Sequence, residues 1–391
     1  MSSMHMYDII IIGAGPIGSY TAYQLAKDGF DVLVVEKNKS FTNPPACTGI
    51  IGLESFERFN LPNDSILSTV KDVKFISPSG LSLSFCPTST MAFVVDRIKF
   101  DNGLRELALK NGASIRPDTS CEEIKIKDTY AEVKVNDSRE TIKAKAICIA
   151  SGYNCRLNEK LGLGRPSDYV QGVQTEVAIE ELKETEIYIG NSIAPGSFAW
   201  AVRLNDGQAR IGLTTKHNAS MFMERFLKSH FLRDRIKEKG AIISKIIPVG
   251  TLRRTFCDRI LVIGEAAGLL KTTTHGGIYY GLISSQLAVE TFKEVFRRGD
   301  FGICSMSRYE RLWRKTLDRE IKTGSLFRRF FSHFNDEQIN RLFRIAMSDG
   351  IMNIVYKKAK FDWHGDLILS LIKHSLFKNI FRMGRNHLSP H

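Results

Sequence analysis

Several features that define other protein classes are absent from the 391-residue sequence. No apolar run approaches the length of about 18 residues that a membrane-spanning helix needs. The N-terminus has no basic stretch followed by an apolar one, so we expect no export signal and a cytoplasmic location. No nucleic-acid-binding motif is present, so we also expect no nucleic-acid partner.

Cysteines are few, and their spacing matches no metal-binding or redox motif. The seven are dispersed, with no CxxC pair, at positions 47, 86, 121, 148, 155, 257 and 304. An odd, dispersed set predicts reduced thiols, with no disulfide framework and no metal site.

Negative charge is scarce in the last quarter of the chain. Of the formal net charge of +13, residues 297–391 carry +10, from 19 Lys and Arg against 9 Asp and Glu. This excess predicts an acidic partner, such as anionic lipid, a phosphorylated substrate or an acidic electron carrier. The alternative is a well-solvated helical surface.

Residues 7–36 form the most informative stretch, because a strand, a glycine-rich turn, a helix and a second strand follow in order. The turn has the pattern GxGxxG, supplied by Gly13, Gly15 and Gly18. Its first two glycines permit a tight turn and close approach to a pyrophosphate, and the third lets the helix lie near the sheet. Glu36 ends the second strand, where a carboxylate can accept both ribose hydroxyls. The pattern favours FAD or NAD over NADP, and over a purely structural turn.

Four separated segments together resemble the geranylgeranyl reductase family, whose members are FAD enzymes with the para-hydroxybenzoate hydroxylase fold. They are GAGPIG with Glu36, PACTG at 45–49, VVDRIKFDNGLRELALKNGA at 94–113 and GEAAGLLKTTTHGGIYYG at 264–281. The resemblance runs from about residue 7 to residue 296 and is most specific in the last segment. The C-terminal region matches only in being helical.

The expected fold class is therefore mixed α/β. Strand-like runs separated by turns over residues 170–215, together with residues 73–97, predict an antiparallel sheet, and after residue 296 the pattern is helical. We predict three parts: a discontinuous Rossmann-type FAD-binding domain at 1–72, 98–165 and 255–296, an antiparallel-sheet substrate domain at 73–97 and 166–254, and a helical, basic C-terminal region at 297–391.

The segment 264–281 also has a physical interpretation of its own, because a strand ends in Gly-Glu and a Gly-Gly pair then opens a long helix. A helix N-terminus presents free N–H groups and a positive dipole end to an anion. By resemblance, Gly264 and Glu265 contact the ribityl and pyrophosphate part of FAD, and the N–H groups of residues 276–278 stabilise reduced flavin at its N1–C2 edge. The family usually has Asp where Glu265 stands.

The resemblance implies a larger set of cofactor-binding residues. It comprises Gly13, Gly15, Pro16, Ile17, Gly18, Glu36, Lys37, Ala46, Cys47, Arg97, Gly264, Glu265, Gly268, Gly276, Gly277 and Ile278. Arg97 corresponds to an arginine beside the flavin, and the alternative is a surface ion pair with Asp101 one helical turn later.

Cys47 is the candidate catalytic residue. In the family, a cysteine in a loop rich in proline and glycine lies beside the flavin ring and faces the substrate, and PACTG places Cys47 there. The alternative is an ordinary small buried thiol. Its role is either proton donor to the alkene or control of the flavin geometry, and the sequence does not choose between them.

Residues 198–212 stand where the family has Tyr-x-Trp-x-Phe-Pro…Gly-x-Gly, a pattern that lines its lipid cavity. Two residues of the pattern are kept, Trp200 and Gly212, and four are replaced, by Phe198, Val202, Arg203 and Arg210. By resemblance, Phe198, Trp200 and Gly212 belong to the substrate cavity. The alternative is an aromatic strand that packs in the core.

Residues 367–385 can be drawn as an amphipathic helix with basic residues on one side. Such a helix suits a membrane surface from which a long lipid enters. A helix packed on the protein's own core is the alternative. The expected location is therefore cytoplasmic, with peripheral contact to anionic membrane.

The resemblance implies a FAD-dependent reductase that saturates isoprenoid double bonds of a polyprenyl lipid or lipid precursor. No second nucleotide-binding fingerprint is present, so electrons come from an external donor, transient NAD(P)H or a ferredoxin-like carrier. The alternatives are a flavin monooxygenase of the same fold and a membrane-docked electron-transfer flavoprotein acting on a quinone. A halogenase is disfavoured because its Trp-x-Trp-x-Ile-Pro signature is absent.

Overall fold

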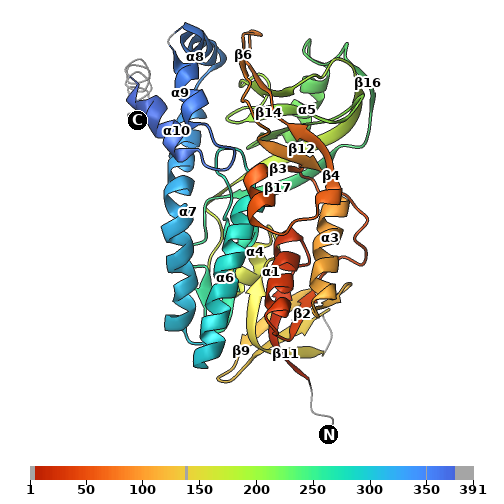
Figure 1. Cartoon of the computed structure of the whole chain (residues 1–391), viewed down its shortest axis with the longest axis vertical. Coiled ribbons are helices and arrows are strands. Elements are labelled where there is room, and N and C mark those ends of the chain that lie inside the picture. The colour runs from red at the N-terminus through yellow and green to blue at the C-terminus, as the bar shows by residue number, and fades with distance from the viewer. Residues whose placement is uncertain (1–4, 137–139, 349, 375–391) are drawn as a thin grey trace.

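The computed structural model describes residues 5–136, 140–348 and 350–374. In Figure 1 a sheet with its helices forms the lower part of an elongated molecule, and strands of a second sheet lie at the upper right. The C-terminal helices run along the left side.

The first sheet contains the glycine-rich turn. Its strands are β1 (Met6–Ile12), β2 (Val32–Val35), β8 (Ser114–Arg116), β9 (Cys121–Ile126), β10 (Ala131–Val135), β11 (Thr141–Ile149), β18 (Phe256–Cys257) and β19 (Ile260–Val262). Five are parallel, in the order β19-β11-β1-β2-β8. All four residues of β2 and the last four of β1 are buried, as expected for parallel strands covered on both faces.

Three helices cover this sheet: α1 (Pro16–Lys27), α3 (Arg97–Lys110) and α6 (Ile278–Arg298). Pro16 begins α1, where its fixed φ suits a first helical turn. Asp96 caps α3, since its Oδ1 accepts the N–H groups of Ile98 and Lys99 at 2.9 and 3.1 Å. Helices α1 and α6 pack together in Figure 1, and hydroxyls of Thr21 and Ser285 lie 2.7 Å apart between them.

The second sheet is antiparallel except for one pair of strands. Its strands are β5 (Val73–Ile76), β6 (Ser82–Phe85), β12 (Asp168–Ile179), β13 (Thr185–Ile189), β14 (Phe198–Asn205), β15 (Gln208–Thr215), β16 (Ile236–Lys239) and β17 (Ile243–Val249). They lie in the order β16-β12-β15-β14-β13-β5-β6, with β17 also on β12, and β5 runs parallel to β13.

One predicted strand joins a different sheet. Residues 92–97 were expected in the antiparallel sheet, but β7 (Ala92–Val95) is the middle strand of a separate sheet with β3 (Ile50–Gly52) and β4 (Ile66–Val70). Ala92, Val94 and Val95 are fully buried there, which explains why this strand is central rather than at an edge.

The remaining elements are helical. They are α2 (Leu53–Arg58), α4 (Cys155–Lys160), α5 (Ala219–Leu227), α7 (Ile303–Phe331), α8 (Asp336–Ser348), α9 (Ile351–Lys358), α10 (Gly365–Lys373) and short 3-10 turns at Asn63–Ser65 and Gly264–Ala267. The predicted helix 367–385 coincides with α10 up to residue 373, and residues 375–385 lie outside the described residues. Within the described part of the chain, no helix has the length and apolar character needed to cross a bilayer.

The predicted mixed α/β class is confirmed, with its Rossmann-type parallel sheet, antiparallel sheet and helical C-terminal region. The chain enters the antiparallel sheet at β5, leaves it after β6 and returns at β12, so the two large sheets interleave along the sequence. The boundaries given above for the three parts stay a prediction.

Candidate functional site

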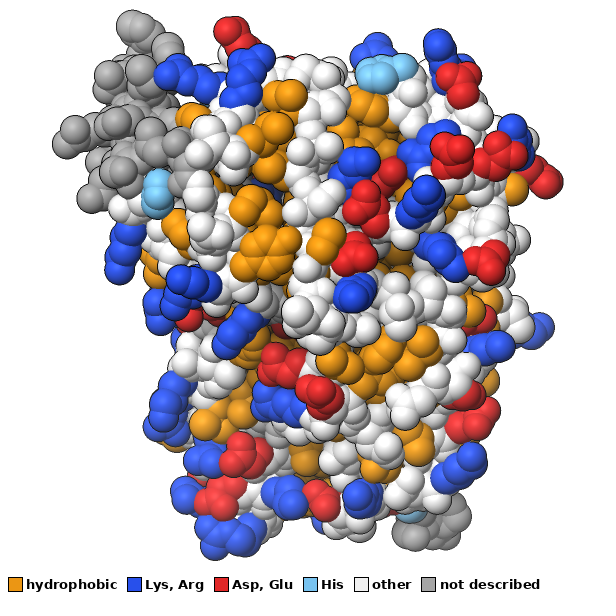
Figure 2. All heavy atoms as spheres, turned by 45° about the horizontal axis from the view of Figure 1, so that its top comes forward, with side chains coloured by type: hydrophobic (Ala, Val, Ile, Leu, Met, Phe, Trp, Pro, Cys, Tyr) orange, Lys and Arg blue, Asp and Glu red, His pale blue; other side chains and the backbone are white. Residues whose placement is uncertain are grey.

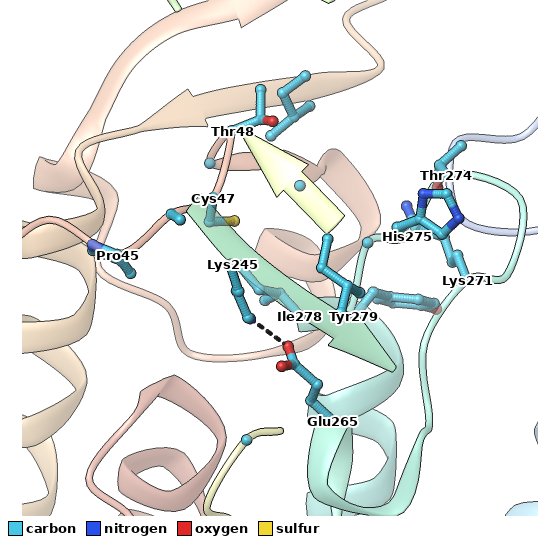
Figure 3. Close-up of a pocket in the computed structure, with 18 of the residues that line it drawn as sticks. Pro45, Cys47, Thr48, Lys245, Glu265, Lys271, Thr274, His275, Ile278 and Tyr279 are labelled. Atoms are coloured by element: carbon cyan, nitrogen blue, oxygen red, sulfur yellow. Dashed lines mark hydrogen bonds and ion pairs between the residues drawn. The ribbon is translucent and has the colours of Figure 1, made fainter. Parts of the chain in front are cut away.

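A large cavity of about 1120 Å³ lies where the two large sheets and the C-terminal helices meet. Its walls come from the glycine-rich turn, the loop 43–49, strands β14 and β17, the loop before α6, and the ends of α7, α9 and α10. Figure 3 shows part of this lining, with Cys47 and Glu265 on opposite sides of Lys245. The cavity therefore joins all three predicted parts of the chain.

The glycine-rich turn forms one end of the cavity. Gly13, Gly15, Pro16 and Ile17 line it, whereas Gly18 does not. A Cβ at Gly13 would lie 2.6 Å from the carbonyl oxygen of Ala150, and one at Gly18 would lie 1.9 Å from that of Gly13. Gly18 therefore permits the close packing of turn and helix, and the turn itself stays open toward the cavity.

Glu36 is buried at the same end and also lines the cavity, as does Lys37. Oε2 of Glu36 accepts the N–H of Ala14, and Oε1 of Glu36 accepts the N–H of Asn38, both at 2.9 Å. Arg105 donates to the carbonyl oxygen of Ala14 at 2.9 Å, which ties α3 to the turn. The carboxylate is thus held by backbone while each oxygen keeps a further acceptor site.

The loop before α6 forms the opposite wall. Glu265, Gly276, Gly277 and Ile278 line the cavity, and α6 begins at Ile278, so its first turn opens there. Gly264 and Gly268 do not line it. A Cβ on Gly268 would lie 2.0 Å from the carbonyl oxygen of Gly250, so close backbone packing requires glycine at this position.

Glu265 pairs with a lysine that sequence reasoning missed. Lys245 Nζ lies 2.6 Å from Glu265 Oε2, as the dashed line in Figure 3 shows, while the buried Glu265 Oε1 has no partner. Lys245 lies on β17, where alternation places it on the same face as Ile243 and Ile247 and leaves Ile246 exposed. That alternation was a readable signal, but β17 was not predicted as a strand.

These residues fit a dinucleotide. The turn leaves open space at Gly15, Glu36 keeps acceptor sites, and the first turn of α6 and the unpartnered Glu265 oxygen face the same cavity. Open glycine backbone and a helix N-terminus are the features that accept phosphate groups, and carboxylates accept hydroxyls.

Cys47 lies in the loop 43–49 and lines the cavity together with Ala46. The antiparallel sheet holds this loop in place. Gln174 donates to the carbonyl oxygen of Cys47 at 3.1 Å, and Arg210 donates to that of Thr48 at 2.5 Å. The thiol is therefore fixed by backbone contacts rather than by a hydrophobic core of its own.

The surroundings of Cys47 favour its ionised form. Burial opposes ionisation, but the positive charges of Arg97, Lys245 and Arg210 and a backbone hydrogen bond at Gly49 outweigh it, so the pKa of the thiol is lowered. By contrast, burial raises the pKa of Cys121 and of Cys257 to about 12. Cys47 thus differs in acidity from these structural thiols.

Arg97 lies beside Cys47 and lines the cavity. Its Nε and Nη2 donate to the two carboxylate oxygens of Asp101 at 3.1 and 3.0 Å. The predicted ion pair is therefore present, but it is buried rather than at the surface, since Arg97 is only 8% exposed.

The aromatic strand β14 places Phe198 and Trp200 on the cavity, while Gly212 on β15 lies behind Trp200. A Cβ at Gly212 would lie 2.4 Å from the Trp200 ring, so glycine is required for the ring to pack across β15. Arg203 points to solvent and pairs with Asp206, and Arg210 pairs with Glu176 at 2.6 Å. Neither arginine lines the cavity.

Sequence reasoning also missed two polar groups in the wall formed by the loop before α6. Lys271 pairs with Asp362 at 2.7 Å, and both side chains are less than 10% exposed. His275 is buried, with a positive φ of 61°. Lys271 and Asp362 are 91 residues apart, so no local pattern reveals their contact.

Comparisons with known proteins show what the chain is similar to. A family model described as "FAD dependent oxidoreductase" matches residues 8–54. The chain is 28% identical to a digeranylgeranylglycerophospholipid reductase of Methanocaldococcus jannaschii, over 90% of this chain and 93% of that protein. It is 27% identical to a digeranylgeranylglycerophospholipid reductase 2 of Methanococcoides burtonii, over 86% of this chain and 87% of that protein.

Solved structures share the fold. A geranylgeranyl bacteriochlorophyll reductase-like protein from Thermoplasma acidophilum superposes with a TM-score of 0.85 at 21% identity, covering 98% of this chain and all of that one. The halogenase PltM, in complex with phloroglucinol and FAD, superposes with a TM-score of 0.71 at 16% identity, covering 98% of this chain and 93% of that one. Together with the sequence relatives, these similarities confirm the predicted resemblance to the geranylgeranyl reductase family, and with it an FAD-dependent oxidoreductase whose cofactor is FAD.

Proposed function

We propose that this protein saturates isoprenoid double bonds of a polyprenyl lipid or lipid precursor. The observation that carries the proposal is the one cavity that extends from the glycine-rich turn past Cys47 to the aromatic strand β14 and the apolar ends of α7 and α10. Relatives over most of the chain are named as reductases of a lipid with geranylgeranyl chains. A mostly apolar cavity suits such a chain.

FAD would be held by the residues that line the dinucleotide end. In the proposal, the turn 13–18 receives the pyrophosphate, Glu36 the ribose, and the N–H groups of residues 276–278 the flavin. When bound and reduced, FAD would supply a hydride to one carbon of the alkene. Arg97, Lys37 and Ala46 also line this part of the cavity, and Lys245 keeps Glu265 in place through their ion pair.

An isolated alkene is a poor hydride acceptor, so a proton must reach the second carbon in a cavity from which water is excluded. Cys47 would hold that proton at Sγ. The nearby cations Arg97 and Lys245 stabilise the thiolate that remains. In the proposal, electrons reach the flavin from an external donor, NAD(P)H or a ferredoxin-like carrier.

Product analysis tests this function against its alternatives. Dithionite-reduced protein is incubated with a geranylgeranyl lipid, and in parallel with oxygen or with a quinone, and the products are identified by mass. A saturated prenyl chain supports the proposal. A hydroxylated product formed only with oxygen would instead identify a monooxygenase, and quinol formation with an unchanged lipid an electron-transfer flavoprotein.

Glu36→Arg is expected to weaken FAD binding by roughly 30- to 150-fold, because a hydrogen bond to a charged group contributes about 2–3 kcal/mol. Glu36 also accepts the N–H groups of Ala14 and Asn38, so a melting curve must accompany the titration of apoprotein with FAD. Glu36→Gln, which keeps the shape and one acceptor oxygen, should have an FAD affinity between those of wild type and Glu36→Arg. Unchanged affinity in Glu36→Arg would remove this residue from the FAD site.

We also propose that the C-terminal helices dock on anionic membrane. In Figure 2, Lys and Arg side chains follow the left edge of the molecule, the side on which Figure 1 shows α7. Exposed apolar side chains accompany them on α7, α8 and α9: Leu326, Met347 and Tyr356. Basic residues beside exposed apolar ones are typical of a surface that binds anionic lipid.

Vesicle co-sedimentation tests the docking. Binding to anionic vesicles should fall with added salt, since exposed charges are screened over ~10 Å at 0.1 M. Reversing the exposed Lys357 and Lys358 of α9 to Glu should weaken it, whereas reversing Lys237 and Lys239 of β16 changes the net charge equally and should not. Equal binding to neutral and anionic vesicles would reject the docking.

A further inference from the structure

His275 occupies an unusual backbone position in the cavity wall. Its φ of 61° lies in the left-handed region, which a residue other than glycine adopts only at some cost. Its side chain is nevertheless only 8% exposed and lines the cavity beside Thr274, as Figure 3 shows. The surrounding contacts therefore fix an imidazole where a glycine would be less strained.

One ring nitrogen of His275 has a partner and the other has none. Nδ1 lies 3.3 Å from the Thr214 hydroxyl, which in turn lies 2.5 Å from the Ser197 hydroxyl. The ring stacks on Phe198, with 6.1 Å between centroids and 6° between planes. Nε2 is buried without a partner. If Thr214 donates to Nδ1, Nε2 carries the proton and is a donor without an acceptor.

The charge state of His275 excludes one role. Burial and the positive charge of Arg328 lower the pKa of His275 to about 3. The imidazole is therefore neutral near pH 7 and supplies no imidazolium for proton transfer. What remains is a fixed neutral ring nitrogen, Nε2, in the cavity wall, which is an N–H donor when Thr214 donates to Nδ1.

Arg328, on α7, contributes a second buried donor, which is positively charged. It lines the cavity, and its Nε is buried without a partner. Its Nη2 donates to Asp168 at 3.0 Å, and Lys216 Nζ lies 3.2 Å from the other oxygen of Asp168. Two cations share one carboxylate, so one positive charge is left uncompensated within this group.

We propose that His275 and Arg328 form a subsite that binds the phosphate-type oxygens at the polar end of the lipid. A buried donor without an acceptor is destabilising, and an acceptor supplied by the ligand would remove that penalty. A phosphate group offers several oxygens and a negative charge to match the uncompensated cation. This inference rests on the proposed function, since it places the polar end of that substrate.

Equilibrium binding to the FAD-loaded protein tests the subsite with two matched probes, geranylgeranyl diphosphate and geranylgeraniol. Wild type should bind the diphosphate more tightly than it binds geranylgeraniol. His275→Gly and Arg328→Gln should each weaken diphosphate binding by about 10- to 100-fold and leave geranylgeraniol within about twofold. Arg329→Gln, on the exposed neighbour, is the control and should change neither. FAD content should stay constant throughout.

Three results would overturn the subsite: no preference of wild type for the diphosphate, equal losses for both probes, or loss of FAD in the variants. The last would mean that the residues serve the cofactor rather than the lipid. Should Arg328→Gln fail to fold, His275→Gly carries the test, because glycine adopts the required φ freely. Binding that follows this pattern without any saturated product would reject the reductase function and leave the subsite standing.

Discussion

Cys47→Ala is expected to keep its FAD and its fold and to lose about 10²- to 10⁴-fold in the rate of alkene saturation, the usual contribution of a positioned proton donor. The loop 43–49 is held by backbone contacts from Gln174 and Arg210, which the substitution leaves in place. The assay is saturated product from chemically reduced protein, normalised to bound FAD, beside a melting curve.

The serine variant separates shape from acidity. Cys47→Ser should have a rate of alkene saturation between those of wild type and Cys47→Ala if the side chain only controls geometry. Its rate should be as low as that of Cys47→Ala if the acidity of the thiol matters. Because the pKa of Cys47 is lowered, its proton is lost at a lower pH than that of an ordinary thiol. A donor must be protonated, so wild-type activity should fall as pH rises through this lowered pKa, and this step should be absent from the alanine variant.

Cys304→Ala is the matched control, since this cysteine is exposed on α7 and lies outside the cavity lining. It should behave as wild type. Wild-type turnover in Cys47→Ala would make Cys47 an ordinary loop cysteine, and lower stability with unchanged activity per folded molecule would point to a purely structural role.

Asp362→Ala is expected to destabilise the protein by about 3–5 kcal/mol, the usual cost of leaving a buried charge without its partner. Lys271 and Asp362 lie 2.7 Å apart and are 7% and 2% exposed, so the charge of Lys271 is buried and would be left without this carboxylate. Phe361 adds a cation–π contact, with Lys271 Nζ 4.4 Å from its ring centroid. Denaturant unfolding of the FAD-loaded protein measures the loss.

Two further variants make this result specific. Lys271→Met combined with Asp362→Asn removes both charges and should recover most of the stability, because no buried ion is left alone. Asp366→Ala breaks an exposed ion pair between α10 and Arg319 of α7. It should lower the free energy of unfolding by less than about 1 kcal/mol. An Asp362→Ala variant as stable as wild type would show that Lys271 finds another partner or reaches water.

The nucleotide-binding half was predictable because its signals are local. Apolar runs, glycines at fixed spacing and Glu36 all lie within 30 residues, and they fold into consecutive elements of one sheet. The loop around Cys47 was located through the resemblance, whereas its place in the cavity depends on long-range contacts with Gln174 and Arg210.

What could not be predicted depends on contacts between distant segments. The pairing of β7 with β3 and β4, rather than with the large antiparallel sheet, depends on which strands bury Ala92 and Val94. Lys245 approaches Cys47 and Glu265 only because β17 pairs with β12. The partner of Lys271 lies in a region that matched the family only in being helical.

A single anaerobic turnover tests the proposed alkene reduction most directly. Protein with reduced FAD, freed of excess reductant, is mixed with a geranylgeranyl lipid in the absence of oxygen, and flavin absorbance and lipid mass are followed together. If the reduced flavin saturates the alkene, the flavin is reoxidised and the lipid gains two hydrogens for each flavin oxidised. A flavin that stays reduced, or that is reoxidised without a gain of hydrogen in the lipid, would contradict the proposed reduction.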